Sequence, residues 1–258
     1  MERKPRILII NDDGIHAPGL KHLWNAVSEI GDVTIVAPAS EKSGVGQSIT
    51  IYSPLHVETV SWEKDTPAWK VSGTPADCVR LALSVILKEK PDLIVSGINK
   101  GSNSGRTTFF SGTVGGVIEG ALRNIPGVAF SCENYEKPDY AATEKYIVQI
   151  VNHLIEHPLV HGTILNVNFP DATTFKGLKL ARQGKGYWIE EPDTRQHPHG
   201  HTYYWLGGQW GHHEEEEESD VRLLTQGYIT AVPILVDELT HHTFLNERKQ
   251  HFESVFSL

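Results

Sequence analysis

The sequence predicts an α/β protein in which helices cover both faces of a mostly parallel sheet, with a β-hairpin appendage. Short apolar runs such as RILII, VTIVAP and TILNVNF recur through the first 170 residues, separated by stretches with helical spacing of apolar residues. Most positions in these runs are apolar, without a strict alternation of apolar and charged residues, which is typical of parallel strands buried on both faces. After Arg182 the pattern changes to glycine-punctuated aromatic segments typical of hairpins.

The predicted strands are the apolar runs of the first part of the chain. They occupy residues 6–10, 33–38, 68–71, 92–97, 127–131 and 163–169, with a further extended segment at 49–60. The predicted helices lie between them, at residues 18–30, 75–87, 113–123 and 141–157. Two are well delimited: Pro18 is near a first turn with Gly31 past the end, and Thr74 is an N-cap before Pro75.

The last part of the chain is predicted to be an appendage. Its hairpin-like segments are residues 184–192, 201–210 and 223–240. We therefore expect a catalytic core over residues 1–182, with an appendage, return strand and arm over 183–258 belonging to the same structural domain. The histidines in HPHGH (197–201) and in the acidic run 212–220 are interpreted as loop and solvated-turn residues, and their role stays open.

Composition limits the classes of partner. The chain has 258 residues, 39% hydrophobic residues and a formal net charge of −9, so a broad surface for a nucleic-acid polymer is not expected, whereas a small phosphorylated ligand is compatible. Cys78 and Cys132 are the two cysteines, and we expect buried free thiols. The apolar run after Arg6 is too short for a leader and no run approaches a membrane span, so we expect a cytoplasmic protein.

Polar residues follow the strands at the positions where parallel sheets bind ligands. Asp12 and Asp13 follow the first strand, Ser43 follows the second after a few residues, and Asn99 follows DLIVSG. Two carboxylates, a hydroxyl and an amide are hard oxygen donors that suit Mg²⁺ or Mn²⁺. Two carboxylates balance a divalent charge and leave coordination positions for water and a phosphate oxygen.

Three glycine-bearing stretches provide donors for a phosphate group. They are SGVGQS, INKGSNSG and SGTVGG, each at a strand-to-helix junction. The predicted phosphate-binding residues within them are Gly44, Asn99, Ser111, Gly112 and Thr113. A purely structural interpretation also exists for each: NDDG is an acceptable turn, and SGT is an acceptable helix cap.

Motifs of several other phosphate and ester chemistries are absent from the sequence. Neither cysteine lies in a His-Cys…Arg loop, no Asp-x-Asp follows a strand, and the chain contains no phosphate loop ending in Gly-Lys-Ser/Thr and no G-x-S-x-G elbow.

The motifs resemble those of the SurE family of 5′-nucleotidases. They are IINDDGIHAPGL, VAPASEKSGVGQSIT, VSGTPADCVRLAL, PDLIVSGINKGSNSG, FFSGTVGGVIEGAL, LNVNFP, YYWLGG and QGYITAVPI, in family order over nearly the whole chain. The resemblance implies a Rossmann-like three-layer core, a C-terminal oligomerisation arm exchanged between protomers, and homodimers or homotetramers. It also implies one divalent cation per subunit on Asp12, Asp13, Ser43 and Asn99.

Four positions depart from the family pattern. Ser219 precedes Asp220 where Thr is usual, VRLLTQ (221–226) replaces a segment that typically contains Trp and Ala, Gln47 replaces a common His, and Phe110 replaces Tyr. These changes leave the predicted metal ligands intact, while the substrate preference and the details of the appendage stay open.

The predicted reaction is metal-dependent hydrolysis of nucleoside 5′-monophosphates, with Asp12 and Asp13 as catalytic residues. Nucleoside 3′-monophosphates and short polyphosphate are further candidate substrates. Two alternatives remain: a nucleotide-binding module without turnover, and a metal-dependent nucleoside hydrolase, which would release a free base instead of phosphate.

Overall fold

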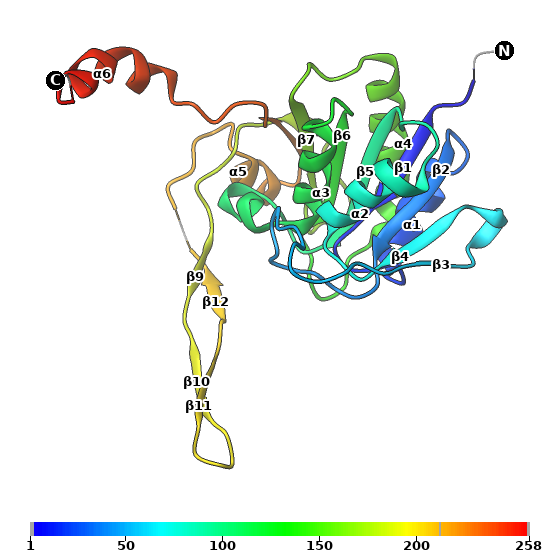
Figure 1. Ribbon diagram of the computed structural model, residues 1–258, viewed down its shortest axis with the longest axis horizontal. Coiled ribbons are helices and arrows are strands. Elements are labelled where there is room, and N and C mark those ends of the chain that lie inside the picture. The colour runs from blue at the N-terminus through cyan, green and yellow to red at the C-terminus, as the bar shows by residue number, and fades with distance from the viewer. Residues whose placement is uncertain (1–2, 212, 257–258) are drawn as a thin grey trace.

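A nine-stranded sheet forms the centre of the computed structural model, which describes residues 3–211 and 213–256 (Figure 1). Its strand order is β3-β4-β2-β1-β5-β6-β7-β13-β8. The strands are β1 (Arg6–Ile10), β2 (Asp32–Pro38), β3 (Val57–Thr59), β4 (Ala68–Val71), β5 (Leu93–Lys100), β6 (Gly127–Cys132), β7 (Thr163–Phe169), β8 (Leu178–Leu180) and β13 (Ile229–Leu235).

Six neighbouring strands of this sheet, from β4 to β7 in the order above, run parallel. β3 pairs antiparallel with β4, and β13 pairs antiparallel with β7 along six positions. The carboxyl ends of β1, β5, β6 and β7 therefore meet at one edge of the sheet. The prediction of a mostly parallel α/β core is confirmed.

Helices cover both faces of the sheet. α1 (Pro18–Val27) and α4 (Tyr140–Glu156) pack on one face, and α2 (Pro75–Leu81), with its π-helical continuation Ala82–Ile86, and α3 (Gly112–Ala121) pack on the other. Two further helices are α5 (Asp220–Thr225) and α6 (His242–Ser254), and 3₁₀ turns lie at Glu63–Asp65 and Gly105–Phe110.

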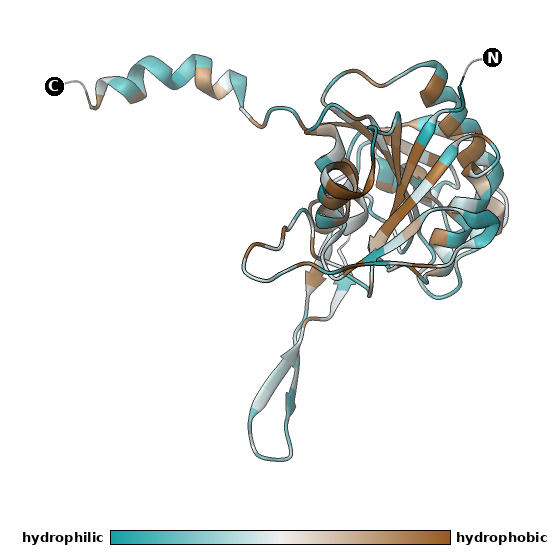
Figure 2. Ribbon diagram, turned by 45° about the vertical axis from the view of Figure 1, so that its right-hand side comes forward, coloured by the Kyte–Doolittle hydropathy of each residue, from teal (hydrophilic) through white to brown (hydrophobic). Residues whose placement is uncertain are grey.

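Alternate residues of β1 show how the core divides between the two faces. Ile7 and Ile9 pack in the cluster that contains the buried side chains of α1 and α4, whereas Leu8 and Ile10 pack in the cluster of α2 and α3. This is the period of two that a strand imposes. Figure 2 shows the resulting apolar central strands between helices of mixed hydropathy.

α2 begins as the sequence predicted. The Thr74 hydroxyl accepts from Asp77 N–H, and the Asp77 carboxylate accepts from Thr74 N–H, which together form a capping box. Other boundaries differ. α1 ends at Val27 instead of residue 30, and of the extended segment 49–60 only Val57–Thr59 joins the sheet. β5 continues three residues further than predicted, to Lys100.

A long hairpin extends away from the body (Figure 1). Its strands are β9 (Trp188–Glu190) paired with β12 (Gly208–Trp210), and β10 (Asp193–Gln196) paired with β11 (Thr202–Trp205). Segments 184–192 and 201–210 are thus the two sides of one hairpin. The prediction of a further hairpin over 223–240 is wrong, because this segment holds the end of α5 and the single strand β13.

The C-terminal helix α6 also lies apart from the body and buries none of its described residues (Figure 1). Large apolar side chains of this arm are exposed: Leu239, Phe244, Leu245, Phe252, Val255 and Phe256. None of the helices in the described residues has both the length and the apolar composition of a membrane span.

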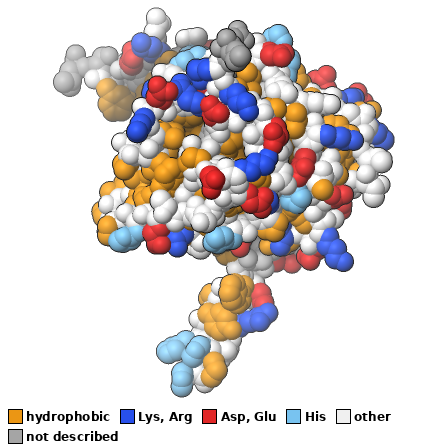
Figure 3. Space-filling model, turned by 90° about the vertical axis from the view of Figure 1, so that its right-hand side faces the viewer, with side chains coloured by type: hydrophobic (Ala, Val, Ile, Leu, Met, Phe, Trp, Pro, Cys, Tyr) orange, Lys and Arg blue, Asp and Glu red, His pale blue; other side chains and the backbone are white. Residues whose placement is uncertain are grey.

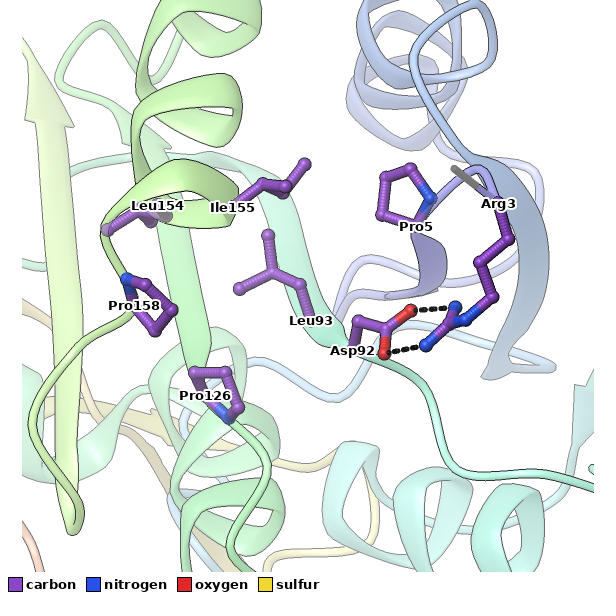
Figure 4. A pocket seen from close by; sticks show the side chains of 8 residues that line it. All are labelled: Arg3, Pro5, Asp92, Leu93, Pro126, Leu154, Ile155 and Pro158. Atoms are coloured by element: carbon purple, nitrogen blue, oxygen red, sulfur yellow. Dashed lines mark hydrogen bonds and ion pairs between the residues drawn. The ribbon is translucent and has the colours of Figure 1, made fainter. Parts of the chain in front are cut away.

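A pocket of about 480 Å³ lies at the amino-terminal edge of the sheet (Figure 4). Leu154 and Ile155 form its apolar wall, and Arg3 donates twice to the Asp92 carboxylate at its other side. Its charged groups pair with each other, and it lies at the opposite edge from Asp12 and Asp13.

Candidate active site

β1 ends in a tight turn that holds two carboxylates. The Asn11 side-chain amide donates to Gly14 O at 2.8 Å, and Ile15 N–H donates to Pro38 O at 2.8 Å. Gly14 has φ +99°, a backbone conformation that favours glycine. The turn leaves Asp12 only 3% exposed, while Asp13 remains half-buried.

The N-terminus of α3 lies against Asp12. Thr113 Oγ1 donates to Asp12 Oδ1 at 2.6 Å. A Cβ on Gly112 would stand 2.8 Å from Asp12 Cβ and 3.0 Å from its Oδ2, so only glycine allows this approach. Ser111 caps the helix by accepting from Val114 N–H at 3.1 Å. The predicted phosphate-binding residues Ser111, Gly112 and Thr113 therefore lie next to the first carboxylate.

The end of β5 brings Asn99 and Lys100 to the same place. Asn99 is 8% exposed, and its Nδ2 donates to Gly101 O at 2.7 Å, while its Oδ1 accepts no hydrogen bond within the described part of the chain. Lys100 N–H donates to Asp13 Oδ2 at 3.3 Å. The β5–β6 register shifts between Ser96 and Asn99, so the strand end is irregular where it meets the carboxylates.

The loop after β2 reaches the site through its backbone. Lys42 N–H donates to Asp12 O at 2.7 Å, which places Ser43 one residue away from this contact. The Ser43 hydroxyl is exposed and donates to Glu41 Oε1 at 2.8 Å. Gly44 is also exposed, with φ +73°. The structure thus brings Asp12, Asp13 and Asn99 together, and holds Ser43 nearby with its hydroxyl directed to Glu41.

Within the described residues no cationic side chain pairs with Asp12, and the charge of Lys100 compensates that of Asp13 only in part. Burial raises the pKa of Asp12 to about 7, against the effect of the Thr113 hydrogen bonds, and the neighbouring Asp13 charge raises it further. Burial raises the pKa of Asp13 to about 6, against the hydrogen bond from Lys100 N–H, and Glu41 adds a second raising effect. A divalent cation would supply the missing positive charge, so the donor set fits such an ion.

A buried polar network that the sequence did not reveal supports this site. Asn103 Nδ2 donates to Ser131 Oγ at 2.8 Å and to Thr113 Oγ1 at 3.3 Å. Asn103 N–H donates to Asn168 Oδ1, and Asn103 O accepts from Asn166 Nδ2. Asn103 therefore connects the ends of β6 and β7 to the threonine that bonds Asp12. The alternating asparagines of TILNVNF were the sequence feature from which this network could have been predicted.

The histidine-rich loop forms the tip of the hairpin (Figure 3). His197 lies near His199 and His201, with ring centroids 5.3 and 6.5 Å away. No group of three histidine, cysteine or acidic residues suited to a metal ion occurs among the described residues. His212 lies outside them.

Fold and site together define an α/β protein with an acidic, oxygen-rich site at the carboxyl edge of a parallel sheet, beside a helix N-terminus. The model of the family Survival protein SurE matches residues 7–190. The chain therefore belongs to the SurE family, as its motifs predicted.

Known relatives are similar to this chain over nearly the full length of both. "5′-nucleotidase SurE" of Protochlamydia amoebophila is 48% identical, with 98% of this chain and 99% of the relative covered. The protein of the same name from Flavobacterium psychrophilum is 43% identical, with 93% and 95% covered. The crystal structure of SurE from Aquifex aeolicus superposes with a TM-score of 0.82 at 37% identity, covering 95% of this chain and 99% of that one.

Proposed function

We propose that this protein is a metal-dependent phosphomonoesterase that hydrolyses nucleoside 5′-monophosphates to nucleoside and phosphate. The observation that carries the proposal is the meeting of Asp12, Asp13 and Asn99 beside the N-terminus of α3. The relatives named 5′-nucleotidase support the hydrolase class and the nucleotide substrate.

The cation would be Mg²⁺ or Mn²⁺, one per subunit. Asp12, Asp13 and Asn99 Oδ1 would hold it, with Ser43 as a fourth ligand after its hydroxyl turns from Glu41. When bound, the cation supplies charge withdrawal from phosphorus and a lowered pKa for water.

The phosphate group would bind between the carboxylates and α3. The first N–H groups of this ten-residue helix, at Gly112 and Thr113, have no partner in the preceding turn of the helix and favour an anion. Ser111 adds a hydroxyl, and Gly44 adds a backbone N–H from the loop after β2. Asn99 carries a second N–H besides the one given to Gly101, which makes it a donor for phosphate as well.

The chain's own contribution to the reaction is positioning and proton transfer. Asp12 is held in one orientation by Thr113, which Asn103 contacts in turn. We favour Asp12 as the group that orients and deprotonates the attacking water. Asp13 would be the second carboxylate that holds the cation. A loose phosphoryl transition state takes most of its stabilisation from such fixed charges and donors.

The test is product analysis with adenosine 5′-monophosphate in Mg²⁺ or Mn²⁺, with and without chelator. Free phosphate and adenosine, formed only with the metal, are expected. Free adenine would favour the nucleoside hydrolase, and binding without any product would favour the binding module. Parallel incubations with 3′-monophosphates and short polyphosphate define the substrate range.

The assembly is also part of the proposal. The exposed apolar side chains of α6 and the exposed Tyr204, Trp205 and Leu206 of the hairpin support a homodimer or homotetramer in which these segments contact other copies. Light scattering of the full chain and of a chain ending at residue 238 tests the arm, and an unchanged mass on truncation would refute its role. The two buried free cysteines, Cys78 and Cys132, support a cytoplasmic location.

A further inference from the structure

A lysine and a tyrosine lie side by side next to the carboxylates. Lys100 is the last residue of β5, and its Nζ lies 4.2 Å from the centroid of the Tyr135 ring. Its backbone N–H donates to Asp13 Oδ2. Tyr135 belongs to the loop that follows β6. Because β5 and β6 are neighbours, the pair borders the site on the side opposite to the Ser43 loop, which follows β2.

The tyrosine ring is fixed at one edge and open over much of its surface. Tyr135 is 57% exposed. A Cβ on Gly101 would lie 3.3 Å from Tyr135 Cδ2, so the glycine lets the ring pack against the end of β5. Lys100 contacts Asp13, and the next residue, Gly101, contacts the Tyr135 ring. Since consecutive Cα atoms lie about 3.8 Å apart, one nucleotide is long enough to reach from Asp13 to the ring.

Hydrogen bonds hold the loop that carries the ring. Glu133 N–H donates to Phe169 O at 2.9 Å, and the Asn134 side-chain amide donates to Asp171 Oδ1 at 2.9 Å. Lys137 N–H donates to Asn134 Oδ1 at 2.8 Å. The ring therefore projects from a backbone tied to the end of β7, and little ordering is needed when a ligand contacts it.

Lys100 places a positive charge at this border. Its ammonium has no carboxylate partner in the described part of the chain, and its charge favours the ionised form of Asp13. It therefore opposes the net negative charge of the protein at the point where an anionic ligand would enter.

We propose that Tyr135 and Lys100 form the subsite for the nucleoside part of the substrate, in which the base stacks on the Tyr135 ring and Lys100 fixes the ring and attracts the anion. The inference rests on the proposed function and adds the residue that separates nucleotides from phosphate esters without a base. Aromatic rings accept every base through its π-face, so this subsite favours nucleotides as a class.

The experiment compares adenosine 5′-monophosphate with ribose 5-phosphate, which lacks the base, in the full chain with Mn²⁺. The Tyr135→Ala variant is expected to raise KM for the nucleotide about tenfold, with kcat changed less than twofold and with ribose 5-phosphate unaffected. Tyr135→Phe is expected to restore the wild-type KM. Tyr228→Ala is the matched control, since Tyr228 pairs with Lys179 at 4.3 Å near the far end of the sheet.

Phe109 is the competing candidate, since it is an exposed ring in the 3₁₀ turn Gly105–Phe110 just before α3. Three results would overturn the subsite: an unchanged KM ratio in Tyr135→Ala, an equal loss for both substrates in that variant, or a selective loss for the nucleotide in Phe109→Ala and not in Tyr135→Ala. Absence of phosphate release from every substrate by the wild type would instead refute the proposed function. Calorimetric binding of adenosine 5′-monophosphate then still tests the subsite, because Tyr135→Ala must weaken binding about tenfold whether or not turnover occurs.

Discussion

Replacing Asp12 by Asn should stabilise the metal-free protein at neutral and alkaline pH while removing its response to metal. The carboxylate is 3% exposed and has no cationic partner in residues 3–211 and 213–256, so its ionised form is costly in the absence of a cation. Asn has nearly the same shape and can still accept the hydrogen bond from Thr113 Oγ1.

The magnitude follows from the raised pKa of Asp12. In the folded protein this pKa rises from the usual 3.8 to about 7 because of burial. The folded state then binds a proton that the unfolded state has released, so stability falls as pH rises from about 4 to about 7. At 1.36 kcal/mol for each pKa unit, the difference is at most about 4 kcal/mol at pH 8.

Urea denaturation followed by tryptophan fluorescence measures this difference at pH 4 to 8 in chelator, at one protein concentration. The advantage of Asp12→Asn over wild type should grow across this range by up to about 4 kcal/mol. Asp65→Asn is the control and should show no such growth, because this carboxylate is exposed and no described residue pairs with it through a side chain. Saturating Mn²⁺ should restore the lost free energy of unfolding in the wild type and should not change it in Asp12→Asn. Equal pH dependence of stability in wild type and Asp12→Asn would show that the buried Asp12 carboxylate does not destabilise the metal-free fold.

Three further outcomes are expected. Thr113→Val removes the hydroxyl that donates to Asp12 and should lower kcat/KM about ten- to hundredfold, because a hydrogen bond to a charged group contributes about 1.5–3 kcal/mol. Thr113→Ser keeps the hydroxyl and should retain activity. Equal activity of the Val and Ser variants would exclude this role. Both oxygens of the buried Asp220 carboxylate accept backbone N–H groups, Oδ2 from Gly105 and Oδ1 from Gly184 and Val221. In Asp220→Asn the amide NH₂ must face one of these donors, unlike in Asp12→Asn, so the free energy of unfolding should fall by about 1–3 kcal/mol, and an unchanged urea midpoint would contradict this. A fragment of residues 1–182 should fail to fold alone, because it lacks β13, which pairs with β7 along six positions; a cooperative unfolding transition of this fragment would show that the core is independent.

Much of the fold could be predicted because its signals are local. Continuous apolar runs marked the parallel strands, and Thr74 with Pro75 marked the start of α2 through capping chemistry that involves neighbouring residues only. The approach of Asp12 and Asp13 to Asn99 was also predictable, since strands that run parallel bring their carboxyl ends to one edge of the sheet.

The parts that were missed depend on distant partners. α5 was predicted as part of a hairpin because the short segment VRLLTQ has no long helical period, and its burial comes from packing on β13. The Asn103 network joins residues 63 and 65 positions apart, which become neighbours only when β5, β6 and β7 lie in order. The direction of the Ser43 hydroxyl depends on Glu41, and no strand-end rule specifies it.

Anomalous diffraction from a crystal grown with Mn²⁺ tests most directly whether separate segments of this chain converge on one cation. We expect a single strong peak per subunit within coordination distance of both the Asp12 and Asp13 carboxylates and of Asn99 Oδ1. A peak confined to the histidine-rich tip of the hairpin, or an Asp12–Asp13 pair without manganese in protein that still hydrolyses nucleotides, would contradict it.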